Sequence, residues 1–559
     1  MKKNLIVAFY FILFWIILPL TLVTASEWID VRWFPDERVS KSLSPLGWIL
    51  IFTGFIALGT AVFQFKKFSG VFPVSALPPD RLIEKGVFAV WRHPIYLFAC
   101  LIFSGMPFAL RSVGFLVIIL PITLISVGIY IWIEELYLVK RFGRSYALYK
   151  KRVPLLFPEF INLVRVFAAP FFHFWFRIKI QHPENIPDCS PYFVVSAHRN
   201  YFDPFFISYA LPHPIKHICT FEMFRSRMKS SIFRLLGAIP KKRYKMDLQS
   251  NRQLIQALNN GYSIGIFPEG GRSWTGEMRS LKPETLLLLR HYSHIPILPV
   301  RLEGNYYSWP RWSDHLFKAD LIVNFGESFH LNPEMEINEM DLLLQEKIHA
   351  RSEVERSMIC RTKNRIGRLS MVLYRCPCCT VFEALKEIPP DKLLCNSCNK
   401  LFVLQPDLNL NYISGDESRT ESIHSIYRKI KIQENDLSKL PEYQTKTANL
   451  SFLSAREMLL YKSKGQYWNE KDLLFRITMT GEVHLTTLRI VIVSGEHFFA
   501  LDLNDIDAVT IESNKKLQIY QEKTDVLIQL IFESSSALLW QDLLVFILDQ
   551  TFHKKVITR

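Results

Sequence analysis

Long apolar runs separated by short basic clusters make up the first 150 residues of the chain. The runs are Leu5–Val23, Leu46–Phe65, Ile95–Leu110 and Val113–Ile133, and about 20 apolar residues suffice for a helix to cross a bilayer. The third run is the shortest, so we expect a tilted or partly buried helix there. If all four runs cross, the lysine and arginine clusters that border them share one side. The positive-inside rule then predicts four spans, with both chain ends and everything after residue 140 in the cytoplasm.

The first run has two interpretations. Two lysines precede it and small residues follow it, as in a secretory signal peptide. The run is nevertheless too long for the apolar region of a signal peptide and long enough to span a bilayer. We therefore expect a retained membrane anchor rather than a cleaved signal.

An aromatic segment, Phe160–Ile180, follows the last run and carries scattered Arg and Lys. Pro170 lies inside it, and a proline removes a backbone donor from a helix interior, which disfavours one uninterrupted span. The segment predicts an interfacial helix or helix pair on the cytoplasmic leaflet.

Beyond this segment, β-rich apolar runs alternate with helical patterns. Strands are expected at the start of Tyr192–Phe206, at Ser263–Phe267 and at Ile297–Arg301. Helical patterns lie after His198, near Arg225–Leu236 and Asp247–Asn260, from Glu284, and over Glu336–Arg356. This order predicts a mixed α/β sheet with the functional site at the strand ends.

Reactive polar residues end the first two strands. His198 follows the first strand, and Asp203 comes five residues later, directly before Pro204. An Asp followed by Pro is typical of a helix start, so Asp203 could serve only as a cap. A neutral histidine oriented by a carboxylate is, however, a general-base arrangement. The second strand ends in Glu269 and Arg272 beside two glycines, where backbone amides and a guanidinium can hold a phosphate.

Together these motifs resemble the glycerolipid acyltransferase family of the 1-acylglycerol-3-phosphate type, over about residues 160–340. That family has a His-x4-Asp motif and a later FPEGTRS-type block, where this chain has Gly271 in place of the commoner Thr. GAIPKKR, SLKPE and ILPVRLEG stand where the family has further blocks. The resemblance implies catalytic roles for His198 and Asp203, and substrate binding by Glu269, Gly270, Arg272, Arg243, Lys282 and Pro299.

The expected reaction follows from the resemblance. His198 would deprotonate a glycerol hydroxyl of a lysophospholipid such as lysophosphatidic acid, and the oxygen would attack an acyl thioester. The acyl donor would be acyl-CoA or acyl carrier protein. Arg272, with help from Arg243, would hold the acceptor phosphate. Because a carboxylate repels a phosphate, Glu269 is expected to orient Arg272 or to bond an acceptor hydroxyl.

A second resemblance concerns the membrane region. RHPIY precedes the third apolar run and a Glu-Glu pair follows the fourth, so these polar groups flank adjacent spans. Such residues often act only as interfacial anchors. The pattern nevertheless resembles isoprenylcysteine carboxyl methyltransferases and phospholipid methyltransferases, with Phe98 where those enzymes usually have Gly. The resemblance implies an S-adenosylmethionine site lined by Arg92, His93, Tyr96, Glu134 and Glu135.

Five of the nine cysteines lie between Cys376 and Cys398. Two Cys-x2-Cys pairs separated by fifteen residues match a zinc-ribbon spacing, and the expected cytoplasmic location disfavours disulfides. The sequence predicts a structural Zn site made by Cys376, Cys379, Cys395 and Cys398, with Cys378 as a spare neighbour.

The tail after residue 447 is β-rich. Seven strands are expected at DLLFRITM, EVHLTT, RIVIV, FFALDL, AVTIES, KLQIYQ and VLIQLIF, followed by the helical run SALLWQDLLVFIL. This pattern resembles the pleckstrin-homology or GRAM-like fold. Such modules bind a protein or a lipid headgroup, and a scaffold without a ligand is the alternative.

Composition is consistent with a membrane enzyme of several domains. The hydrophobic fraction is 49%, the chain has 43 Phe, and the formal charge is +15. A basic chain can bind nucleic acid, but the long apolar runs favour an anionic membrane surface instead, so no nucleic-acid partner is expected. The expected divisions are a membrane methyltransferase-like domain at 1–158, an acyltransferase domain at 159–356, a zinc ribbon at 372–404, a linker at 405–447, and the pleckstrin-homology-like domain at 448–559.

Three functions remain open on the sequence alone. The first is a membrane-bound acyltransferase of glycerophospholipid biosynthesis or remodelling, with an attached methyltransferase-like domain. In the second the methyltransferase acts on a lipid or prenylcysteine and the acyltransferase domain is non-catalytic. The third is a non-catalytic membrane scaffold. The four residues His198, Asp203, Glu269 and Arg272 favour the first.

Overall fold

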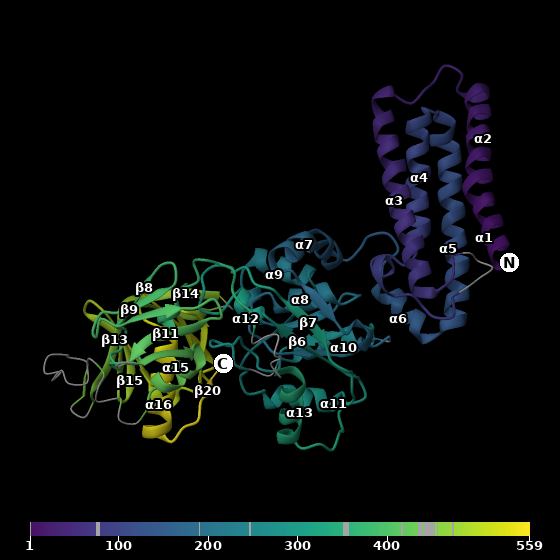
Figure 1. The fold of residues 1–559 in the computed structure, drawn as a ribbon. Helices are drawn as coiled ribbons and strands as arrows, with labels where there is room; N and C mark the ends of the chain where they lie inside the picture. Colours follow the sequence, from purple (N-terminus) through teal and green to yellow (C-terminus); the bar gives the residue numbers. More distant parts are fainter. Residues whose placement is uncertain are drawn as a thin grey trace.

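The computed structural model describes residues 2–73, 79–188, 190–244, 247–349, 357–414, 417–433, 436, 440, 453–454, 457–471 and 474–558. An upright helical bundle stands beside an α/β domain, and a β-rich region lies on the far side of that domain (Figure 1). The bundle holds the N-terminus, and the β-rich region holds the C-terminal part of the chain.

Three helical stretches of the bundle are long and apolar enough to cross a membrane, counting only the described residues: Leu5–Trp33, Lys41–Ser69 and Phe115–Phe142. They contain α1 (Lys2–Ile12) and α2 (Leu18–Trp33), α3 (Ser44–Ser69), and α5 (Leu120–Phe142). The helix at the third predicted span, α4 (Pro94–Leu110), has 17 residues and is shorter. A Cβ on Gly47 of α3 would lie 2.4 Å from the Ala109 backbone nitrogen, so α3 and α4 pack backbone to backbone.

Two helices connect the bundle to the α/β domain. Helix α6 (Arg144–Arg152) ends at Arg152, whose Nη1 donates to the carbonyl oxygen of Gly261 at 2.8 Å. Helix α7 (Phe160–Phe176) continues through Pro170 as a single helix, and Phe172 and Phe176 pack against Phe206. Phe174 of α7 stays 80% exposed. The hydrogen bond between Arg152 and Gly261 therefore joins the two domains directly, in addition to the chain between them.

A mixed seven-stranded sheet forms the middle of the described α/β domain, as the β-α alternation predicts. Its order is β1-β7-β6-β2-β5-β3-β4, and the pair β6–β7 is antiparallel while the other neighbours are parallel. The strands are β1 (Lys179–Gln181), β2 (Phe193–Ser196), β3 (Lys216–Thr220), β4 (Ile239–Lys241), β5 (Ile264–Ile266), β6 (Ile297–Glu303) and β7 (Ile322–Phe325).

Helices cover both faces of this sheet. Successive side chains of a strand point to opposite faces, and apolar side chains of β2 lie on each face. Phe193 and Val195 of β2 join one hydrophobic cluster, and Val194 between them joins the other. The first cluster includes residues of α10 (Leu248–Asn259), α11 (Pro283–His291) and α13 (Ile337–His349). The second includes α7 and α8 (Asp203–Ala210). Strand β2 is thus buried on both faces, and its end carries His198.

The cysteine-containing module is larger than the predicted zinc ribbon. Its five-stranded sheet has the order β12-β11-β10-β9-β8 among the described residues. Strands β8 (Leu385–Ile388), β9 (Lys392–Cys395) and β10 (Leu401–Leu404) lie in the predicted ribbon, whereas β11 (Asn409–Ser414), β12 (Glu417–Ser422) and helix α15 (Ile423–Ile430) lie in the predicted linker. Antiparallel pairing of β10 with β11 makes that part of the linker an ordered extension of the ribbon.

The C-terminal region is β-rich, as predicted. Its described sheet has the order β16-β15-β14-β13-β19-β18-β17-β20, and helix α16 (Ala537–Phe552) closes it. The strands are β13 (Leu459–Lys471), β14 (Leu474–Thr486), β15 (Arg489–Ser494), β16 (His497–Asp502), β17 (Ala508–Ser513), β18 (Lys516–Gln521), β19 (Val526–Phe532) and β20 (Ile557–Thr558). One continuous strand, β14, replaces the first two predicted strands, and β13 was not predicted.

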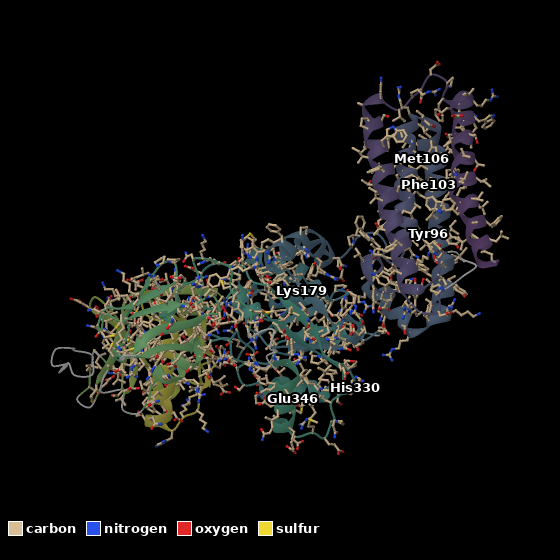
Figure 2. All side chains as sticks on the ribbon, viewed as in Figure 1. Tyr96, Phe103, Met106, Lys179, His330 and Glu346 are labelled. Atoms are coloured by element: carbon tan, nitrogen blue, oxygen red, sulfur yellow. The ribbon has the colours of Figure 1, made fainter. Side chains whose placement is uncertain are left out.

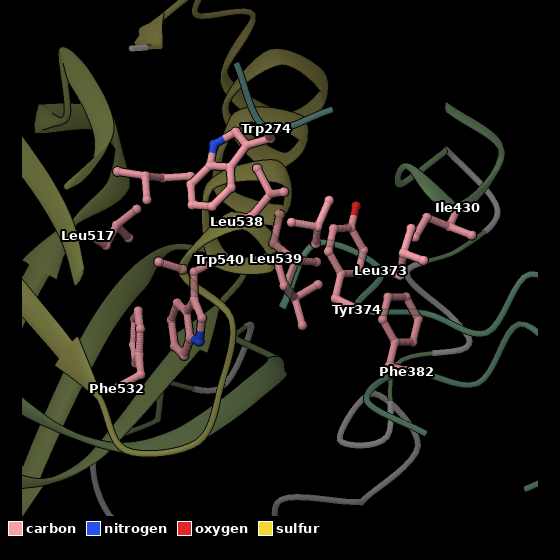
Figure 3. Packing of buried hydrophobic residues seen from close by; sticks show 14 of the residues in the cluster. Trp274, Leu373, Tyr374, Phe382, Ile430, Leu517, Phe532, Leu538, Leu539 and Trp540 are labelled. Carbon is pink, nitrogen blue, oxygen red and sulfur yellow. The ribbon is translucent and has the colours of Figure 1, made fainter. Parts of the chain in front are cut away.

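The C-terminal region shares a hydrophobic core with the α/β domain. Trp274, which follows the FPEGGRS block, lies above Leu538 of α16 (Figure 3). In the same cluster Phe532 of β19 stacks on Trp540, with ring centroids 4.7 Å apart. The block that was expected to bind substrate is therefore anchored in the C-terminal core.

Candidate active site

The structure brings His198 and Asp203 together at the end of β2. Nδ1 of the imidazole lies 2.9 Å from Oδ2 of Asp203, the first residue of α8. Because the Asp203 oxygen is acceptor-only when ionised, Nδ1 carries the proton and Nε2 is left with its lone pair. This tautomer leaves Nε2 able to accept a proton from a substrate hydroxyl.

The carboxylate of Asp203 is buried and its oxygens accept several hydrogen bonds. Oδ2 accepts the backbone N–H groups of Arg199 and Asn200, both at 2.8 Å, in addition to the His198 bond. Oδ1 accepts the side-chain amide of Asn305 at 2.8 Å. Asn305 begins the short helix α12 (Asn305–Ser308) after β6, and its role was not predicted from the sequence. Its only sequence signal is its position just after the ILPVRLEG block.

Burial lowers the pKa of His198, and the neighbouring Arg272 and Arg311 lower it further, while Asp203 acts in the opposite direction. The imidazole also stacks on Phe267, with ring centroids 4.4 Å apart. A lowered pKa keeps the imidazole neutral, and therefore basic, at neutral pH.

Glu269 lies beneath His198 rather than among the residues that line the cavity. One carboxylate oxygen accepts the backbone N–H of His198 at 2.7 Å, and the other accepts the backbone N–H of Arg279 at 3.0 Å. Burial raises the pKa of this carboxyl to about 7. Glu269 thus joins the His198 loop to the loop that follows the FPEGGRS block.

A cavity of about 730 Å³ opens beside His198. Arg272 lines it, and its guanidinium lies 5.5 Å from the centre of the Tyr201 ring. Among the described residues this guanidinium makes no side-chain hydrogen bond. An anionic group entering the cavity can therefore bind Arg272 without breaking an existing pair.

The other residues that were predicted to bind the acyl acceptor have different surroundings. Arg243 lines the cavity and pairs with Glu512 of β17 at 3.1 Å. Gly270 and Lys282 also line it, and the positive φ of Gly270 together with the Lys282 side chain beside it leaves no room for a Cβ. Pro299 is buried in β6, pairs in register with Val195 of β2, and is not among the cavity-lining residues.

Two further cavity residues were not predicted from the sequence. Arg311 stacks on Trp274 at 4.1 Å and donates to the carbonyl oxygens of Arg272 and Ile511. Glu512 comes from the C-terminal sheet, more than 300 residues after His198. Neither belongs to a local motif, so no sequence pattern marks them.

A second polar cluster lies in the helical bundle. Glu135 of α5 is 2.5 Å from both Arg92 and Lys150, and His93 lies 3.4 Å from Glu134. Figure 2 shows Tyr96 below Phe103 and Met106 on α4, and the Tyr96 ring is 5.9 Å from His93. The five predicted residues therefore converge. The atoms Arg92 Nε, His93 Nε2 and Glu134 Oε2 are buried without a hydrogen bond within the described structure, so a polar cofactor fits here.

The four predicted cysteines also meet. Their sulfur atoms all lie within 4.8 Å of one another, with Cys376–Cys398 at 3.8 Å and Cys379–Cys395 at 3.6 Å. Four thiolates about 2.3 Å from a tetrahedral zinc would be about 3.8 Å apart, so the geometry fits this ion. Cys378 is not part of the cluster.

Two family matches agree with these two sites. Residues 177–303 match the Acyltransferase family, and residues 42–145 match the Phospholipid methyltransferase family. The 1-acyl-sn-glycerol-3-phosphate acyltransferase of Bacillus subtilis (strain 168) is 24% identical over 194 residues, which are 34% of this chain and 91% of that protein. Methanethiol S-methyltransferase 1 of Bradyrhizobium diazoefficiens is 32% identical over 126 residues, or 22% of this chain and 43% of that protein.

A solved structure also matches part of the chain. The 1-acyl-sn-glycerophosphate acyltransferase PlsC of Thermotoga maritima is 19% identical, with a TM-score of 0.30, and the match covers 40% of this chain and 90% of that one. Residues 177–303, which include His198 and Asp203, thus match the Acyltransferase family model, and residues 42–145 of the helical bundle match the Phospholipid methyltransferase family model.

Proposed function

We propose that this chain transfers an acyl group from a thioester donor, acyl-CoA or acyl carrier protein, to the free hydroxyl of a lysophospholipid. The observation that carries the proposal is the His198–Asp203 pair beside a cavity that also holds Arg272. Its basic lining suits a phosphate, and its apolar residues suit an acyl chain.

Each side chain has a role in this reaction. Nε2 of His198 takes the proton of the acceptor hydroxyl, and the oxygen attacks the thioester carbonyl carbon. The C–S bond then breaks, and the thiol leaves with the proton held by the imidazolium. Asp203 fixes the tautomer of the imidazole and stabilises its positive charge. Arg272 binds the acceptor phosphate, which holds the hydroxyl within reach of His198.

The long apolar helices of the bundle support a reaction at a bilayer. We propose that the α/β domain and both chain ends face the cytoplasm, with Phe174 of α7 in contact with the lipid surface. A lysophospholipid then reaches the cavity from the adjacent leaflet. The four cysteines hold a structural zinc, which would stabilise the ribbon and has no part in the acyl transfer.

The test is an assay in membranes with radiolabelled acyl-CoA and lysophospholipid acceptors. His198→Ala removes the base, and we expect a rate loss of about 10²–10⁴ with acceptor binding largely kept. Arg272→Ala should mainly raise the KM for the acceptor. If folded His198→Ala acylated every acceptor as fast as the wild type, the chain would be a scaffold rather than an acyltransferase.

A second candidate activity is methyl transfer from S-adenosylmethionine in the bundle. The buried polar atoms of Arg92, His93 and Glu134 that lack hydrogen bonds favour it. The cofactor would supply the methyl group, and these side chains would hold its polar ends. Calorimetry on the full chain should show saturable binding that weakens in Arg92→Ala and Glu135→Ala. Absence of binding at millimolar cofactor would leave the bundle as a membrane anchor.

A further inference from the structure

A carboxylate from the C-terminal sheet lies in the acyltransferase cavity. Glu512, near the end of β17, lines the same cavity as His198 and Arg272, and its side chain is 19% exposed. A carboxylate in the cavity repels a phosphate, because like charges repel. Glu512 therefore bears on which headgroup the cavity accepts.

Within the described part of the chain, Glu512 makes a hydrogen bond through one of its two carboxylate oxygens. Oε2 accepts a hydrogen bond from Nη1 of Arg243 at 3.1 Å. Oε1 makes no hydrogen bond to any residue that the structure describes. Glu512 thus offsets the charge of Arg243 and still has an acceptor atom for a ligand.

Of Arg272 and Arg311, only Arg272 has a guanidinium without a hydrogen bond to a described residue, so it is the one able to bind a phosphate. Arg311 is committed to two carbonyl oxygens and to the Trp274 ring. The Arg272 guanidinium lies over the Tyr201 ring and makes no side-chain hydrogen bond to a residue that the structure describes. The cavity therefore offers a guanidinium able to bind an anion and, beside it, a carboxylate able to bind a cation.

The position of Glu512 is fixed by the domain contact. The carbonyl of Ile511, the preceding residue, accepts from Arg311 at 2.6 Å. Asn514, two residues later, donates to the carbonyl of Trp312 at 3.1 Å, and Tyr520 stacks on Tyr244 at 4.9 Å. The backbone on both sides of Glu512 is thus held against the α/β domain, so its carboxylate is preorganised for binding.

We propose that Glu512 selects lysophospholipids whose headgroup joins an ammonium to the phosphate through a phosphodiester. Arg272 would take the phosphodiester, and Oε1 of Glu512 would take the ammonium while Oε2 remains on Arg243. A phosphate monoester without an ammonium would leave Oε1 of Glu512 without a cationic partner. This inference rests on the proposed acyl transfer and narrows its acceptor class.

The test compares two acceptors with the same acyl chain, lysophosphatidylethanolamine and lysophosphatidic acid, using the full chain in membranes. The wild type should show the higher kcat/KM with lysophosphatidylethanolamine. Glu512→Gln should lower that value about tenfold, the size of one charge-assisted hydrogen bond, and should raise the value for lysophosphatidic acid. Glu512→Asp keeps the charge and should keep the preference for the ammonium headgroup.

A matched control separates headgroup selection from a loosened domain contact. Glu470 of β13 pairs with Arg225 across the same two domains at 2.7 Å, and neither residue lines the cavity. Glu470→Gln should therefore leave the ratio of the two kcat/KM values unchanged. An equal change of that ratio in both variants would overturn the proposal, as would a wild-type preference for lysophosphatidic acid.

Binding measured without turnover keeps this test independent of the proposed activity. In a His198→Ala background, equilibrium binding should favour lysophosphatidylethanolamine, and Glu512→Gln should abolish that preference. Failure of acyl transfer with intact headgroup selection would refute the reaction alone. Equal binding of the two lipids would refute the role of Glu512 even if acyl transfer occurs.

Discussion

The side-chain amide of Asn305 donates a hydrogen bond to Oδ1 of Asp203 at 2.8 Å, from 102 positions further along the chain. The same asparagine accepts, through its backbone carbonyl, a bond from the side chain of Asn200 at 2.8 Å. Asn305 therefore holds the Asp203 carboxylate, which orients His198. It also holds the loop between His198 and Asp203.

Asn305→Ala should reduce kcat about tenfold, because Asp203 Oδ1 loses its partner and the imidazole loses part of its orientation. Burying an unsatisfied acceptor also costs about 1–3 kcal/mol of stability. Initial rates and thermal unfolding measure the two effects. Asn332→Ala removes an exposed turn bond from the Glu334 N–H, far from the site in sequence, and is the control: it should leave kcat unchanged and lower stability less, because water replaces an exposed partner. A kcat equal to that of the wild type would show that Asn305 does not position the pair.

The pH dependence of acyl transfer should follow the lowered pKa of His198. The base is the neutral imidazole, and burial shifts its protonation to lower pH. The acid limb of kcat/KM should therefore lie below pH 6.5, the ordinary value for histidine. A pH–rate profile measures this limb. A limb above pH 6.5 would mean that another group titrates.

Glu269→Gln should lower kcat and leave the KM for the acceptor nearly unchanged. The glutamine amide group would face one of the two backbone N–H donors, so the link between the His198 and Arg279 loops is lost. Substrate titrations separate the two parameters. Glu327→Gln, on an exposed segment after β7, is the control. A selective rise in KM would instead show that Glu269 contacts the acceptor.

The same substitution should change how stability depends on pH. The folded-state pKa of Glu269 is about 7, above its unfolded value near 4.5. Such a raised pKa contributes stability that is fully present below pH 4.5 and is lost as pH rises through 7. The glutamine variant cannot titrate, so its unfolding free energy should fall less over this interval. Chemical denaturation at several pH values provides the comparison.

Elemental analysis should find about one zinc per chain. Cys395→Ser should release the metal and expose the segment from Cys376 to Cys398 to protease, because a structural zinc contributes directly to folding. Cys378→Ser should retain both zinc and protection, since Cys378 lies outside the cluster. Metal-free wild-type protein with an equally protected segment would contradict the zinc site.

Local sequence patterns predicted the structure correctly where a single helix, strand or turn contains the whole pattern. Apolar runs predicted the long helices of the bundle because burial in lipid requires about 20 consecutive apolar residues. The alternation of strands and helices predicted the sheet that carries His198. The spacing of Cys376, Cys379, Cys395 and Cys398 predicted a cluster because each Cys-x2-Cys pair lies in one tight turn.

Strands that depend on distant partners were harder to predict. β13 contains KSKGQ and lacks a clear apolar alternation, and it forms because β14 and β19 pair with its two edges. Gly465 of β13 pairs with Gly481 of β14, so β14 continues through the gap between the predicted strands DLLFRITM and EVHLTT. Strand β11 likewise forms against β10 inside a segment whose polarity predicted a linker.

The sequence by itself determined the long apolar helices, the His198–Asp203 motif and the cysteine set, because each depends on residues close together in the chain. The tertiary structure alone decided that Asn305 supports Asp203, that Trp274 anchors in the C-terminal core, and that Glu512 enters the cavity. These contacts join segments more than 100 residues apart. Periodicity and spacing describe only local geometry, so the packing of whole domains had to bring such residues together.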